Sequence, residues 1–171
     1  MFNFTLMNEI ENWEYELQLI WQKLGKIDNA DFIEQISIHA YKFSGSKAIA
    51  DFEMACAFDS TGHEKEAEPL YRSSLNQGLS GLRRRRARIQ LASTLRNNGK
   101  IDESISILKE EKANYSDELN DAVDSFLALS LFSAGECSEA LSLALKALSQ
   151  YLPRYNNSLH NYASALTLTK K

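Results

Sequence analysis

The chain has 171 residues, of which 44% are hydrophobic and 25% charged, and its formal net charge is −4. These proportions are ordinary for a globular protein and exclude the low hydrophobicity and high charge of a disordered chain. The acidic balance disfavours nucleic acid as a general partner, and the lack of a run of about 18 apolar residues predicts no membrane segment.

The first predicted element is a degenerate helical hairpin over residues 8–43. Its first half carries an apolar stripe at helical spacing, which should start the stack of helices. The stripe consists of Trp13, Leu17, Ile20, Trp21 and Leu24. Because the preceding residues lack a positively charged stretch and soon meet Glu9 and Glu11, they are not expected to form a secretory signal.

A repeat follows from four glycines, Gly25, Gly62, Gly99 and Gly135, at intervals of 37, 37 and 36 residues. A small residue stands five positions after each glycine, and large apolar residues stand eight and four positions before it. The small residues are Ala30, Ala67, Ser104 and Ala140; the apolar pairs are Leu17 and Trp21, Met54 and Phe58, Leu91 and Leu95, Leu127 and Leu131. The i, i+4 spacing places each pair on one helical face.

Each unit is therefore predicted to be a helix, a tight turn at the glycine, and a second helix opened by acidic or polar residues. The expected repeats span 47–79, 83–113 and 118–151. Beyond Pro153, Leu159, Tyr162, Ala163 and Leu166 recur at helical spacing over residues 155–168 and predict a capping helix. We expect one domain over residues 1–171.

These residues resemble the tetratricopeptide repeat family, and the run from Phe52 to Leu166 is similar to a bacterial group of small tetratricopeptide proteins. The runs that carry the resemblance are FEMACAFDSTGHEKEAEPLY, RRRRARIQLASTLRNNG, FLALSLFSAGECSEAL and LPRYNNSLHNYASAL. The resemblance implies an all-α, right-handed superhelix of about four helical hairpins plus a C-terminal capping helix. It also implies a concave groove lined by the first helix of each hairpin.

A polar stripe in the third repeat is the candidate surface for a partner in that groove. Arg86, Gln90, Ser93 and Asn97 follow one another at helical spacing, while Arg96 and Asp59 each stand three residues before a repeat glycine. Asp59 and Arg96 could form a structural pair or be bridged by a ligand. Arg86, Arg96 and Asn97 resemble the residues with which related domains clamp a carboxyl-terminal peptide.

The run Arg83, Arg84, Arg85 and Arg86, with Arg88, allows two interpretations. One is an anion site for an acidic peptide, phosphate or RNA, built from guanidinium groups. The other, which we favour, is an acidic partner within the chain or in another subunit, such as the glutamate-rich first segment.

No catalytic, metal or cofactor motif accompanies His39, His63 and His160, so an enzyme is not expected. Cys56 is expected to point toward the groove and Cys137 to be a small packing group; two such distant cysteines favour the reducing cytoplasm. Aromatic residues of the last repeat and the cap are expected to be core or capping side chains: Phe126, Phe132, Tyr151, Tyr155 and Tyr162.

The predicted function is a protein-protein interaction module or adaptor that binds a peptide or partner protein in its groove. One alternative is a structural homo-oligomer, such as a homodimer, that uses the same surfaces. The other is an accessory protein that binds RNA or another anionic ligand through residues 83–88.

Overall fold

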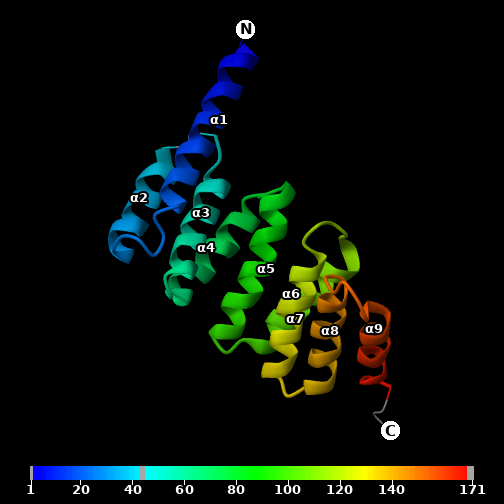
Figure 1. Ribbon diagram of the computed structural model, residues 1–171. Coiled ribbons are helices and arrows are strands. Elements are labelled where there is room, and N and C mark those ends of the chain that lie inside the picture. Colours follow the sequence, from blue (N-terminus) through cyan, green and yellow to red (C-terminus); the bar gives the residue numbers. More distant parts are fainter. Residues whose placement is uncertain (1, 43–44, 169–171) are drawn as a thin grey trace. The chain divides into compact units, whose positions relative to one another are not determined.

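The computed structural model describes residues 2–42 and 45–168. Every regular element in these ranges is an α-helix (Figure 1). In chain order they are α1 (Phe2–Trp21), α2 (Asn29–Lys42), α3 (Lys47–Ser60), α4 (Glu64–Asn76), α5 (Gly81–Asn97), α6 (Ile101–Asn114), α7 (Asn120–Ser133), α8 (Cys137–Ser149) and α9 (Asn156–Ala165). The all-α repeat fold is confirmed, and none of these helices could span a membrane.

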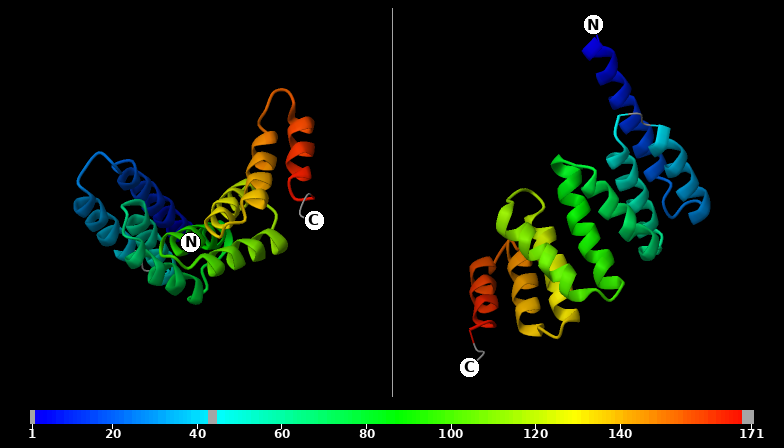
Figure 2. Two further views of the ribbon diagram at one scale, coloured as in Figure 1. Left: turned by 90° about the horizontal axis from the view of Figure 1, so that it is seen from below. Right: turned by 180° about the vertical axis from the view of Figure 1, so that it is seen from behind.

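The helices form two compact units, the first ending at Arg84 and the second beginning at Arg85. In the first unit α1 packs on α2, α2 on α3, and α3 on α4; in the second α6 packs on α7, α7 on α8, and α8 on α9. The views of Figure 2 show the same neighbours within each unit. Each helix thus packs mainly on its neighbours in the sequence, as in a helical repeat.

Helix boundaries extend the predicted hairpins at two places. Helix α1 begins at Phe2 instead of residue 8, because the stretch FNFTLM contains neither glycine nor proline to stop a helix. Helix α5 begins at Gly81, shortly before the expected start at residue 83. Residue 43, the predicted end of the first hairpin, lies outside the described residues.

The turn at Gly135 shows how each repeat reverses direction. Gly135 has a φ of 86°, in the left-handed region that favours glycine. Its N–H donates to the carbonyl of Phe132 at 3.0 Å, and the N–H of Glu136 donates to Leu131 at 2.9 Å. This pair of bonds satisfies the last carbonyls of α7 and recurs at Gly62 and Gly99.

Small residues lie where helices of a hairpin approach most closely. Ala92 in α5 and Ser104 in α6 are both fully buried. The Ser104 hydroxyl lies 2.6 Å from the carbonyl oxygen of Ala92 and 2.8 Å from the hydroxyl of Ser130 in α7, so it joins three consecutive helices. The predicted apolar pairs are buried or partly buried at their expected positions.

Several aromatic residues and both cysteines differ from their predicted environments. Phe132, Tyr151, Tyr155 and Tyr162 are each at least 65% exposed instead of forming core or cap, because no described helix covers their side chains. The two cysteines also have the opposite exposure to the one predicted. Cys56 is buried within its unit and does not face a groove, whereas Cys137 is exposed.

A buried carboxylate links three helices of the first unit. Asp51 in α3 is fully buried and accepts hydrogen bonds from Lys47 (2.6 Å), Tyr41 in α2 (3.0 Å), and Ser73 and Gln77 at α4 (2.8 and 2.7 Å). Burial alone would raise the pKa of Asp51, but these donors outweigh it and hold the pKa below its ordinary value. The ionised form therefore stabilises the first unit.

We expect Asp51→Asn to lower the free energy of unfolding of the first unit by about 2 kcal/mol at pH 7, because charge-assisted hydrogen bonds are lost. A lowered pKa means that the stabilisation is present above the unfolded-state pKa of about 4 and is lost as the pH falls further. Urea titrations followed by fluorescence of Trp13 and Trp21, the two tryptophans, report this unit. Glu34→Gln, an exposed change in α2, is the control and should retain the wild-type pH dependence.

We expect Gly135→Ala to lower the stability of the second unit by about 1–2 kcal/mol, since a methyl group disfavours the left-handed conformation. A Cβ atom at Gly135 would have nothing within 4 Å, so the cost comes from the backbone alone. Thermal unfolding followed by circular dichroism measures this loss of stability. Gly135→Asn should cost less, and Ser138→Ala in the first turn of α8 should change little; equal effects of all three would contradict the explanation.

Candidate functional site

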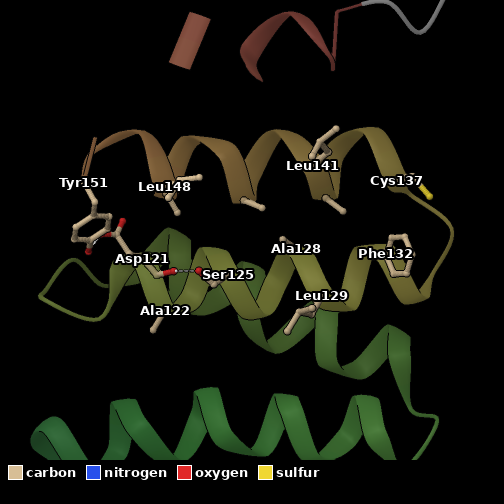
Figure 3. Close-up of a pocket in the computed structure, with 13 residues that line it drawn as sticks. Asp121, Ala122, Ser125, Ala128, Leu129, Phe132, Cys137, Leu141, Leu148 and Tyr151 are labelled. Atoms are coloured by element: carbon tan, nitrogen blue, oxygen red, sulfur yellow. Dashed lines mark hydrogen bonds between the residues drawn. The ribbon is translucent and has the colours of Figure 1, made fainter. Parts of the chain in front are cut away.

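A groove of about 830 Å³ runs between α7 and α8 in the second unit (Figure 3). Its floor contains small residues, among them Ala128, Ala140 and Ala144, which lie along the seam of the two helices. Large apolar side chains rise beside them: Leu129, Phe132, Leu141, Leu148 and Tyr151. The groove follows the helix axes because the lining residues recur every three or four positions on each helix.

The large side chains of the groove are unusually exposed for apolar residues. Phe132 is 65% exposed and Tyr151 71%, while Leu129, Leu141 and Leu148 lie between 46% and 50%. An isolated exposed leucine is common on protein surfaces, but a contiguous apolar patch marks an interaction site. The groove is therefore a candidate binding surface.

One end of the groove is polar. The Tyr151 hydroxyl donates to Asp121 at 2.7 Å, and the Gln150 side-chain amide donates to the same carboxylate at 2.8 Å. The hydrogen bond to Asp121 raises the pKa of Tyr151. Figure 3 shows Asp121 and Tyr151 at this end, with Phe132 and Cys137 at the other. Among the lining residues Asp121 is the one carboxylate, and there is no lysine or arginine.

The repeat register relates this groove to the predicted polar stripe. Ala122, Leu129 and Phe132 stand thirteen, six and three residues before Gly135, as Arg86, Ser93 and Arg96 stand before Gly99. From the sequence, these positions are predicted to face a partner in the third repeat, with Asp59 in the second, whereas Phe132 is predicted to lie in the core. Extending the same register by one repeat would have shown an apolar surface on α7.

The predicted stripe lies on α5. Arg86 and Asn97 are exposed, and Gln90, Ser93 and Arg96 are half-buried. Arg96 donates through Nη2 to the side-chain oxygen of Asn97 at 2.9 Å, and its Nε atom is buried without a hydrogen-bond partner among the described residues. The guanidinium group thus retains donor capacity.

Asp59, the remaining residue of the predicted groove, belongs to the first unit. It accepts a hydrogen bond from the Tyr71 hydroxyl at 3.2 Å. Its contact with Arg96 would join the two units and stays a prediction.

Within the first unit, the arginine cluster begins with an ion-pair network. Arg83 donates through Nη2 to Glu14 at 2.7 Å and through Nε to Glu53 at 3.1 Å, and its guanidinium lies 5.9 Å from the centre of the Trp13 ring. Burial alone would lower the pKa of Arg83, but the two carboxylates outweigh it and raise the pKa. Glu14 is part of the acidic first segment, so Arg83 has the intramolecular acidic partner that we favoured.

Arg85 and Arg88 have acidic partners in the second unit. Arg85 is 3% exposed and contacts Glu111 at 2.9 Å and Asp117 at 3.2 Å, while Arg88 contacts Glu111 at 2.9 Å and also Glu110. An external anion would have to compete with these carboxylates. Arg84, half-buried, completes the predicted anion patch, which stays a prediction.

The histidines of the first unit have structural partners. The Nε2 atom of His39 lies 2.9 Å from the carbonyl oxygen of Trp13, on which its ring stacks, and the Nδ1 atom of His63 lies 3.0 Å from the Thr61 hydroxyl. No group of three or more potential metal ligands occurs among the described residues. These contacts give the two histidines a packing role.

Comparison with known proteins identifies the family. The family model described as a tetratricopeptide repeat matches residues 48–166, which is more than half of the chain. No curated protein matches the chain, and no solved structure does. The matched region runs from α3 to the end of α9 and contains the three glycine turns with their shared hydrogen bonds. The chain belongs to the tetratricopeptide repeat family.

Proposed function

We propose that this chain is a protein-interaction module that holds a segment of a partner protein in the α7–α8 groove. The observation that carries the proposal is the exposure of five large apolar side chains around one continuous groove. Tetratricopeptide repeats generally mediate protein-protein interaction, which supports a protein partner. The partner would cover surface that is otherwise in contact with water.

The exposed apolar surface can contribute a large part of the free energy of binding. Fully burying a leucine or phenylalanine side chain contributes roughly 1.5–3 kcal/mol. Association costs an estimated 4–15 kcal/mol in lost motion, so one such side chain alone is insufficient. Because each of the five is about half exposed, covering all of them contributes roughly 4–8 kcal/mol, which offsets a large part of this cost.

The stripe on α5 is the second part of the proposed surface. Arg86, Gln90, Ser93, Arg96 and Asn97 would supply polar contacts to the same partner, and Asp59 would help to position Arg96. The guanidinium of Arg96 has five N–H donors, one of which binds Asn97, and another would donate to a carboxylate or carbonyl oxygen of the partner. Since these positions correspond by register to those lining the α7–α8 groove, one partner segment could contact successive repeats.

The two alternative functions involve a second copy of the chain on the same surfaces or an anionic ligand at residues 83–88. A homo-oligomer could cover the groove with another copy of the chain. An accessory protein could bind RNA or another anion at residues 83–88. The carboxylates already bound to Arg83, Arg85 and Arg88 weaken that second alternative, because fewer donors are available for phosphate groups.

A photoreactive amino acid at position 132 tests the groove in cells. We expect irradiation to give a discrete adduct with another protein when the probe replaces Phe132, and none when it replaces exposed Ser106 on α6. Adding Leu148→Asp should weaken binding of the partner by about 1.4 kcal/mol. This loss of binding free energy reduces the adduct at position 132 about tenfold. Equal adducts from both positions would contradict the proposal, and an adduct of two copies of the chain would favour the homo-oligomer.

A further inference from the structure

We propose that the occupant of the α7–α8 groove is an amphipathic α-helix of a partner protein, which places a lysine or arginine against Asp121. This inference rests on the proposed function and adds the chemical class of the partner. It joins two observations, the apolar length of the groove and the single carboxylate at one end.

The apolar lining favours a helix over an extended peptide. An extended peptide exposes backbone N–H and C=O groups, which cost free energy when they are buried without partners. Most of the groove lining is alanine, leucine and phenylalanine, which offer no side-chain hydrogen bonds. A helix satisfies its backbone groups internally and presents only side chains.

The dimensions of the groove also suit a helix. Its lining runs from Cys137, the first residue of α8, to Tyr151 just beyond the end of that helix, which at 1.5 Å per residue is about 21 Å, or four helical turns. Small residues at the seam allow the axis of a third helix to come within roughly 8–10 Å of the axes of α7 and α8. Nine residues after the repeat glycine, Tyr71 and Leu108 are fully buried, whereas Ala144, at the same position of the fourth repeat, is exposed.

The charge at Asp121 selects a basic partner. Tyr151 and Gln150 use two of the roughly four acceptor sites of the carboxylate, so a third donor can still bind. An arginine or lysine on the partner would complete the set, and an acidic residue at that position would be repelled.

The same charge argues against a second copy of the chain. If two copies paired groove to groove, Asp121 would be covered by a surface whose lining contains no lysine or arginine. Burying a carboxylate without a cation is costly. A heterologous basic helix avoids this cost.

A displayed library of helical peptides of about 15 residues, selected on the full chain, tests the inference. We expect enriched peptides to carry apolar residues at i, i+3 or i+4, and i+7, with lysine or arginine near one end. One enriched peptide is then synthesised, and its dissociation constant is measured by fluorescence anisotropy. Replacing its basic residue with glutamate should weaken binding about tenfold.

Two variants of the chain locate the contact. On Asp121→Lys the preference should reverse, so that the glutamate peptide binds about tenfold more tightly than the lysine peptide. Ala144→Trp fills the groove and should reduce binding of either peptide at least tenfold. Ser106→Trp on exposed α6 is the matched control and should leave binding unchanged.

The outcomes separate this inference from the proposed function. Enrichment of extended, proline-containing or acidic peptides, or an unchanged preference on Asp121→Lys, would overturn the basic helix while the cross-link at position 132 still supports a protein partner. If sedimentation equilibrium shows a dimer that Ala144→Trp dissociates, a second copy occupies the groove and the inference is wrong. If Ala144→Trp binds the peptide normally and the cross-link is also absent, both proposals fail.

Discussion

Close approach of neighbouring helices is the constraint on which each unit of this protein depends. Ser104 has a side chain small enough for α6 to approach α5, and its hydroxyl then reaches the carbonyl oxygen of Ala92 and the hydroxyl of Ser130. A larger residue would separate the helices and break both contacts. The glycine turns serve the same packing, because they reverse the chain within a few residues and let a helix fold back on its predecessor.

Charged groups add a second set of constraints on this scaffold. Asp51 accepts hydrogen bonds from side chains of α2 and α4, and Glu111 forms ion pairs with Arg85 and Arg88 of α5. Each buried charge has an opposite charge or several donors, which is what allows it to remain ionised away from water. Much of the arginine-rich run therefore has a structural role, while exposed Arg86 on the same helix belongs to the proposed binding surface.

The third and fourth repeats show one framework with two surface chemistries. Positions that carry Arg86, Ser93 and Arg96 in α5 carry Ala122, Leu129 and Phe132 in α7. The turns and the seam residues are alike in both repeats, so the exchange affects the surface and not the packing. A repeat can thus change its surface from polar to apolar without changing its fold.

The helices, their pairing and the turns can be predicted from the amino-acid sequence, because glycine, small and apolar residues at a fixed period act over short distances in the chain. The sequence also placed the candidate residues on α5. Which side chains are covered follows from the packing of the folded chain: Phe132 and Tyr151 lie exposed beside a groove, and Arg85 is buried although Arg86 is not. Burial depends on whether another helix lies over a given face, and the local spacing of residues carries no information about that neighbour.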